Sequence, residues 1–122
     1  NPFVGSAMVS TYARCALLLE GLFVFDELQG RDLVSWNSLL SLYAEHELCD
    51  SVILCLEQMH EEGVSPDGST YVYSLKCCGN VGGIMKGQIL HFAVVQSGLE
   101  NDPFVKSTLV DMYVRCACLV QL

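Results

Sequence analysis

The chain has 122 residues, about one ordinary domain, and 52% of them are hydrophobic, which excludes a disordered protein. Fourteen acidic residues against six basic ones give a net charge of −8 and argue against a generic polyanion binder. No run of about 18 apolar residues is present, so we expect no membrane partner. From the first residues, which begin at Asn1 and not at Met, we expect no transit peptide within this chain and expect it to be a piece of a longer protein.

Hydrophobic residues recur with the period of an α-helix along the whole chain. Trp36, Leu39 and Leu40, for example, lie at positions i, i+3 and i+4. Gly63 and Gly98 are expected to end helices in the left-handed conformation. The predicted helices cover residues 3–14, 17–28, 35–46, 50–62, 69–78, 84–97 and 104–116.

A sequence repeat organises these helices. Segment 2–16 returns at 103–117 with nine of fifteen positions identical, and a weaker copy occupies 34–44. Because one helical hairpin cannot bury both of its faces, neighbouring hairpins must stack. We therefore predict an all-α, right-handed α-solenoid of helix-turn-helix (αα-hairpin) repeats. The predicted units, closed by Asp32, Asp67 and Asp102, are 2–32, 33–67, 68–102 and a truncated 103–122.

The unit 33–67 resembles a pentatricopeptide repeat (PPR). Val34-Ser35-Trp36-Asn37-Ser38-Leu39-Leu40, followed by Tyr43, is similar to the first helix of that motif, and segment 56–67 to its end. Unit 68–102 resembles the long (L) variant of the repeat, and units 2–32 and 103–122 the short (S) variant. The order resembles that of the plant P-L-S subclass.

The resemblance implies sequence-specific binding of single-stranded RNA in a mitochondrion or chloroplast, by part of a C-to-U editing or processing factor. In this family one repeat reads one base through its fifth and last residues. Carried over to this chain, the residue pairs are Ser6 with Asp32, Asn37 with Asp67, and Val72 with Asp102, and Ser107 is the fifth residue of the last unit. The resemblance implies that the first pair reads guanine, that the second reads uracil and that the third discriminates weakly. It also implies that Phe3, Val34 and Phe104 wedge between bases.

The implied partners are organellar RNA and other proteins of an editing complex, with no DNA. Lys76 and Lys106, with Arg14 and Arg115, fall on first helices, which line the concave face in this family and would make it locally basic. Two other interpretations remain open. The same Asp residues are good helix caps in any protein, and a similar solenoid could be a tetratricopeptide-like scaffold for proteins.

A degenerate copy of the repeat is a further interpretation. The glycine that usually ends the first helix is replaced by Ala16, Glu47 and Ala117, and the alanine usual in the second helix by Gly21 and Val52. A left-handed residue other than glycine would destabilise the fold by about 1 kcal/mol.

We expect no enzyme, no cofactor and no metal site. The His-x-Glu at residues 60–62 lacks the later Cys-x-x-Cys that a zinc deaminase needs. The glycine-rich segment 79–83 follows a helix rather than a strand, which disfavours a phosphate loop. The seven cysteines form no Cys-x-x-Cys pair and are expected to be buried free thiols in a reducing compartment.

Overall fold

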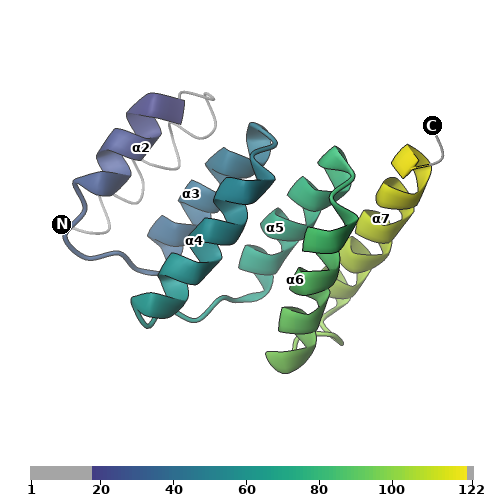
Figure 1. The fold of residues 1–122 in the computed structure, drawn as a ribbon. Coiled ribbons are helices and arrows are strands. Elements are labelled where there is room, and N and C mark those ends of the chain that lie inside the picture. Colours follow the sequence, from purple (N-terminus) through teal and green to yellow (C-terminus); the bar gives the residue numbers. More distant parts are fainter. Residues whose placement is uncertain (1–17, 121–122) are drawn as a thin grey trace.

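The computed structural model describes residues 18–120, which form six α-helices and no strand (Figure 1). This confirms the predicted all-α fold of helical hairpins. The predicted helix 3–14 lies outside the described residues. The helices are α2 (Leu18–Asp26), α3 (Leu33–Glu45), α4 (Cys49–Glu61), α5 (Gly68–Val81), α6 (Ile84–Gln96) and α7 (Pro103–Val120).

The helices alternate between two layers (Figure 1). Helices α3, α5 and α7 lie side by side in one layer, where α5 contacts both of its neighbours. Helices α4 and α6 lie in the other layer, and each packs against the first helix of its own hairpin and against the next one along the chain. The structure is therefore a stack of hairpins, as expected for a solenoid.

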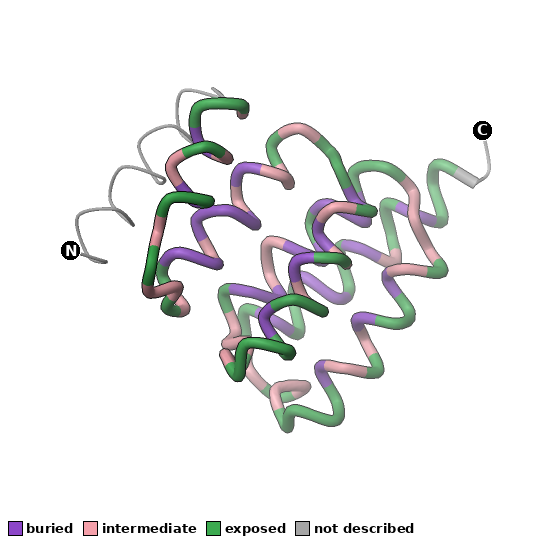
Figure 2. The backbone as a smooth tube through the Cα atoms, turned by 60° about the vertical axis from the view of Figure 1, so that its left-hand side comes forward, coloured by how far each residue is buried: buried purple, intermediate pink, exposed green. Residues whose placement is uncertain are grey.

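One continuous hydrophobic core runs between the layers, and buried turns of neighbouring helices face one another along it (Figure 2). Trp36 is fully buried in α3 and meets Phe25 of α2 edge to face, with 4.8 Å between the ring centroids. Arg31 stacks on the same Phe25 ring at 4.6 Å. The largest fully buried side chains further along are Leu40, Leu42, Met59, Leu75, Leu90 and Met112.

Glycine residues end helices at two of the expected positions. Gly63 and Gly98 have φ of 77° and 74°, which confirms their predicted role as helix ends. Gly82, with φ of 70°, follows the last residue of α5 in the same conformation. Helix α5 therefore ends at Val81 and not at the predicted residue 78. Pro103 is the first residue of α7, where its missing N–H leaves no helical hydrogen bond unmade.

The first helices end differently from what the sequence predicted. Helix α7 does not stop near residue 116 but continues to Val120, because Ala117, where the family usually has glycine, is a strong helix former. Glu47, at the corresponding place after α3, keeps the left-handed conformation with φ of 56°. It is the one non-glycine residue with positive φ among residues 18–120.

The strain at Glu47 predicts a stabilising substitution. Glu47→Gly relieves the unfavourable φ and should raise the free energy of unfolding by about 0.5–1 kcal/mol, after allowing for the more flexible unfolded chain. Glu57→Gly, the same change at an exposed position within α4, should instead lower it by about 1 kcal/mol. Urea denaturation of the two variants measures both values, and equal destabilisation by both would contradict strain at Glu47.

Candidate nucleic-acid interface

The second of the predicted base-reading pairs is brought together by the fold. Asn37 lies in the second turn of α3, and Asp67 is the residue that immediately precedes α5. The Asn37 side-chain amide Nδ2 donates a hydrogen bond of 3.2 Å to Asp67 Oδ1, although 30 residues separate them. Both side chains are half-buried, so the pair is fixed by the protein and still reaches the surface.

Asp67 is also the N-cap of α5, which is the alternative role that the sequence left open. Its Oδ1 accepts a hydrogen bond of 3.0 Å from the backbone N–H of Thr70, and the Asp67 N–H donates in return to the Thr70 hydroxyl at 3.0 Å. This is a reciprocal capping box. The Thr70 hydroxyl has one proton and two acceptors within reach, Asn37 Oδ1 at 2.6 Å and Asp67 Oδ1 at 2.9 Å.

The capping network leaves part of each side chain available. Within residues 18–120, every hydrogen bond to the Asp67 carboxylate goes to Oδ1, and Oδ2 accepts none. The Asn37 amide accepts from Thr70 through Oδ1 and donates one Nδ2 hydrogen to Asp67, which leaves its second hydrogen unused. The pair therefore offers one acceptor and one donor in a fixed orientation.

The network also lowers the pKa of the Asp67 carboxyl. Partial burial acts to raise this pKa, but the backbone and side-chain hydrogen bonds from Thr70, together with the one from Asn37, outweigh it. Asp67 is thus a carboxylate, and only an acceptor, at neutral pH.

The other closing carboxylates cap helices as well. Asp32 Oδ1 accepts from the Ser35 backbone N–H at 2.9 Å and from the Ser35 hydroxyl at 2.7 Å, whereas its predicted partner Ser6 lies outside the described residues. Asp102 Oδ1 accepts from the backbone N–H groups of Phe104 and Val105 at 3.0 and 3.1 Å.

The remaining predicted positions differ in exposure. Val72, the predicted partner of Asp102, is half-buried and packs against the core, where its side chain has no group to hydrogen-bond a base. Ser107 is exposed on α7. Of the predicted wedges, Phe104 and Val34 are 81% and 55% exposed near the starts of their helices, and Phe3 lies outside the described residues.

The charges divide between the two layers in a way that the net charge hides. The layer of α3, α5 and α7 carries three basic residues against two acidic ones, whereas α2, α4 and α6 carry one basic residue against five. Lys76 and Lys106 are exposed, while Arg115 is held by Asp111 at 2.8 Å. The basic residues of the first layer are Lys76, Lys106 and Arg115; Arg14 lies outside the described residues.

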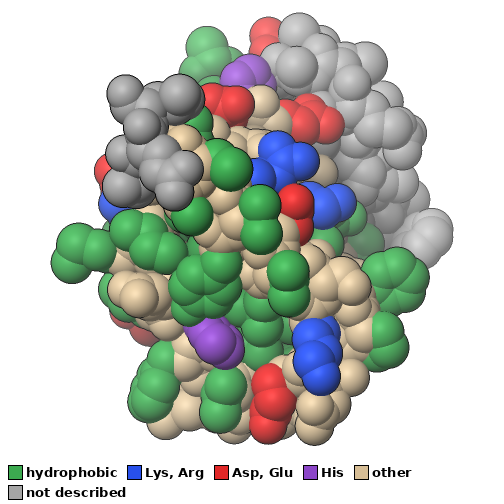
Figure 3. Space-filling view, turned by 90° about the vertical axis from the view of Figure 1, so that its right-hand side faces the viewer, with side chains coloured by type: hydrophobic (Ala, Val, Ile, Leu, Met, Phe, Trp, Pro, Cys, Tyr) green, Lys and Arg blue, Asp and Glu red, His purple; other side chains and the backbone are tan. Residues whose placement is uncertain are grey.

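The face at the α7 end of the stack is more hydrophobic than charged. Figure 3 shows hydrophobic side chains spread across this face, with only scattered Lys and Arg side chains among them. Phe104, Val110 and Val114 of α7 are each more than half exposed. Any electrostatic attraction of an anionic ligand must therefore come from the few basic residues of the first layer.

Sequence reasoning missed Thr70 and Ser35, the residues that hold the closing carboxylates. Each lies three residues after its Asp, which is the spacing of an N-cap and its N3 partner, and this spacing was the signal that could have identified them. One cysteine also differs from expectation: Cys118 is exposed, whereas Cys49, Cys55, Cys77, Cys78 and Cys116 are buried free thiols.

Other classes of site find no support in the part of the chain that the structure describes. Residues 18–120 contain no group of three or more His, Cys, Asp or Glu side chains placed to hold a metal ion. Over the same residues, no helix has the length and hydropathy needed to cross a bilayer.

Comparison with known proteins agrees with the resemblance stated from the sequence. The PPR repeat family model matches residues 31–80. A pentatricopeptide repeat-containing protein of Arabidopsis thaliana with a mitochondrial designation is 33% identical over 119 residues, covering 98% of this chain and 12% of the relative. A chloroplastic one from the same plant is 36% identical over 123 residues, covering 99% of this chain and 23% of the relative. The chain thus spans less than a quarter of these relatives.

The capping network predicts that Thr70→Val will weaken the interface pair. The substitution keeps the side-chain shape but removes the hydroxyl, so the pKa of Asp67 should rise and the free energy of unfolding should fall by about 1 kcal/mol. Because the folded-state pKa lies below the unfolded value of about 3.9, the carboxylate stabilises the fold at neutral pH and loses this effect as the pH falls through the folded pKa.

Carboxyl carbon NMR titration and urea denaturation measure the two effects. Thr108→Val is the matched control, because the Thr108 hydroxyl donates only to the Phe104 carbonyl within α7 at 2.7 Å. It should leave the pKa of Asp67 unchanged. An unchanged pKa in Thr70→Val would refute the proposed network.

Proposed function

The chain belongs to the pentatricopeptide repeat family, and from this we propose that it binds single-stranded RNA and reads one base with each complete repeat. The observation that carries the proposal is the Asn37–Asp67 pair. Its side chains lie 3.2 Å apart at the edge of the first-helix layer, with one acceptor and one donor unused.

Uracil is the base that this pair fits best. The Watson–Crick edge of uracil has an N3–H donor between two carbonyl acceptors, so the Asp67 carboxylate accepts from N3–H and the free Asn37 hydrogen donates to a carbonyl. Cytosine has no proton on N3, so it would have to shift and present its N4 amino group to the carboxylate. Guanine has a donor and acceptor pattern like that of uracil, but it is larger, and we expect the asparagine at position 37 to favour the smaller pyrimidine.

The apolar side chains near the starts of the first helices would separate neighbouring bases. Val34 and Phe104 are exposed one residue after α3 and α7 begin, and a base can stack on either. The first unit, through Ser6 and Asp32, would read guanine. The third unit would discriminate weakly, because Val72 forms no hydrogen bond.

For the longer protein we propose an organellar RNA-processing factor, and within that class a C-to-U editing factor. The mitochondrial and chloroplastic relatives support the organelle, and the resemblance of the repeat order to the P-L-S subclass supports editing. In that setting the chain would bind RNA in a mitochondrion or chloroplast, beside other proteins of the editing complex, and would not itself catalyse a reaction.

A groove in the other layer favours a second function, binding of a protein segment. It opens between α4 and α6 with a volume of about 970 Å³, has an apolar floor that includes Ile53, Leu56 and Ile89, and is bordered by Glu57 and Glu61. An amphipathic segment with apolar anchors and basic side chains would complement it. Asp67 also lines this groove, so a substitution of the exposed Ile89 in α6, rather than a change at Asn37, separates the two functions.

Exchange of the fifth residue tests base reading. In an array where unit 33–67 is one of several repeats, Asn37→Thr should shift the preference at one base from uracil towards guanine, because the shorter side chain leaves room for a purine. The expected change in the ratio of the two dissociation constants is about tenfold, or 1.4 kcal/mol.

Binding to RNAs that differ only at that base measures the ratio. Asn101→Thr, at an exposed position in the turn before α7, is the matched control and should leave the ratio unchanged. If Asn37→Thr weakens binding to all RNAs equally, Asn37 is structural and the proposed reading mechanism is wrong.

The division of charge predicts a second test. Lys106→Gln, in the first-helix layer, should weaken binding to every RNA and reduce the slope of log affinity against log salt by about 0.7. Lys86→Gln is the matched control in α6, where Lys86 pairs with Asp50 at 2.9 Å, and it should change neither quantity. An equal effect of both would place the RNA elsewhere.

A further inference from the structure

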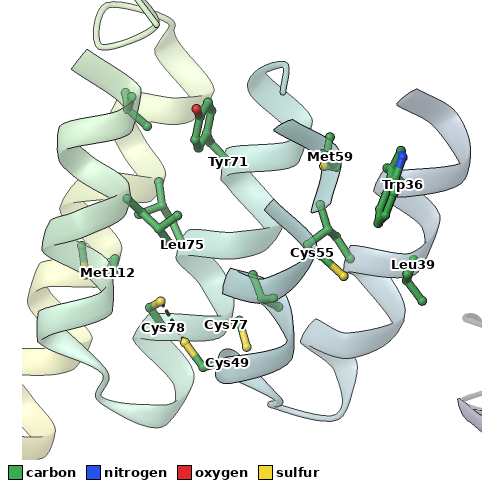
Figure 4. Close-up of a cluster of buried hydrophobic side chains, with 14 of the residues drawn as sticks. Trp36, Leu39, Cys49, Cys55, Met59, Tyr71, Leu75, Cys77, Cys78 and Met112 are labelled. Carbon is green, nitrogen blue, oxygen red and sulfur yellow. Dashed lines mark hydrogen bonds between the residues drawn. The ribbon is translucent and has the colours of Figure 1, made fainter. Parts of the chain in front are cut away.

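Four buried cysteines from three helices lie close together at one end of the core. Cys49 is the first residue of α4, Cys77 and Cys78 follow each other in α5, and Cys116 comes from α7. Cys77 and Cys78 are fully buried, whereas Cys49 is 8% exposed. Figure 4 shows the Cys49 and Cys78 sulfur atoms pointing toward each other across the α4–α5 contact.

The distance between these two sulfur atoms is 3.1 Å, although 29 residues separate the cysteines in sequence. A disulfide bond is about 2.05 Å long, so each sulfur needs to move only about 0.5 Å to reach bonding distance. Cys116 does not compete for this contact, because its Sγ lies against the Cys78 carbonyl oxygen at 3.7 Å.

The surroundings make Cys49 the nucleophile of the cluster. Hydrogen bonds from the Cys77 and Cys78 thiols lower the pKa of Cys49 to about 3, and its place at the first residue of a helix also favours a thiolate. The hydrogen bond to Cys49, followed by burial, raises the pKa of both Cys77 and Cys78. The Cys49 sulfur atom lies beneath the turn between α5 and α6, where a Cβ atom added to Gly83 would be 3.8 Å from it.

We propose that Cys49 and Cys78 are a redox modification site, at which a peroxide closes a reversible disulfide between α4 and α5. The Cys49 thiolate attacks one oxygen of hydrogen peroxide, the O–O bond breaks, and a sulfenic acid and hydroxide form. The Cys78 sulfur then attacks the Cys49 sulfur, and the sulfenic oxygen leaves as water with the Cys78 proton. The hydroxide takes up the proton that Cys49 released when it ionised. Two thiols are oxidised by two electrons in total, and one peroxide is reduced to two waters.

The disulfide would join unit 33–67 to unit 68–102 covalently. Cys49 belongs to the second helix of one hairpin and Cys78 to the first helix of the next, so the bond fixes how these hairpins stack. It also restricts the unfolded chain by closing a loop of about 30 residues, which stabilises the folded state.

Mass spectrometry of the full chain after peroxide treatment tests the proposal. The intact mass should fall by about 2 Da and return on reduction with dithiothreitol. Trypsin cleaves after Arg31, Lys76 and Lys86, so unreduced digestion should link peptide 32–76 to peptide 77–86. The midpoint of thermal unfolding should rise by about 10 °C in the oxidised protein.

Single substitutions assign the bond. Cys49→Ala or Cys78→Ala should abolish the linked peptide, whereas Cys77→Ala and Cys55→Ala should retain it. Cys77 is as buried as Cys78 and adjacent to it, and Cys55 shares peptide 32–76 with Cys49 but has its pKa raised to about 12 by burial. Fragmentation of the linked peptide from the unsubstituted protein assigns the sulfurs even if a variant does not fold. No linked peptide, or a bond through Cys77 or Cys55, would overturn the proposal.

Discussion

The stacking of the hairpins depends on the aspartate carboxylate at the end of each complete repeat unit. Asp32, Asp67 and Asp102 each accept a backbone N–H at the start of the following first helix. Such a cap contributes about 1 kcal/mol, and it fixes where the next helix begins. Because Asp67 caps α5 while its carboxylate contacts Asn37 of α3, one side chain sets both the stacking of two hairpins and the geometry of the interface pair.

Capping also gives the proposed base-reading pair a fixed geometry. In the free protein the Asp67 Oδ1 already accepts from the Thr70 backbone N–H and the Asn37 amide, and the Thr70 hydroxyl lies 2.9 Å from it, so the carboxylate keeps its orientation when a ligand reaches Oδ2. Little side-chain entropy is then lost on binding, and the ligand only replaces water at a fixed acceptor. The Val72 position has no such network, because valine offers no polar group. The units therefore differ in how firmly their proposed base-reading side chains are held before a ligand binds.

The sequence predicted what depends on local periodicity and repetition. The helical spacing of Trp36, Leu39 and Leu40 gave the buried face of α3, and Gly63 and Gly98 gave two helix ends, since both are local properties. The predicted end of α7 near residue 116 was wrong, because Ala117 continues a helix where glycine would end it. The pairing of Asn37 with Asp67 came from the family resemblance, because no spacing rule brings together residues 30 apart. Likewise, the burial of most cysteines followed from composition, whereas the contact between Cys49 and Cys78 is visible only in the folded chain.

Helix α5 connects these features. Its first turn is held by Asp67 and Thr70, its last turn contains Cys78, and along its length it packs against α3, α4, α6 and α7. A rigid helix transmits a displacement at one end to the other, so a shift of its last turn would change the position of its cap. The distance between Asn37 and Asp67 depends on the same helix, because Asn37 belongs to α3 and Asp67 moves with α5. The packing around α5 thus fixes the spacing on which the proposed recognition of a base depends, and a covalent bond at Cys78 would act on that spacing from about 17 Å away along the helix.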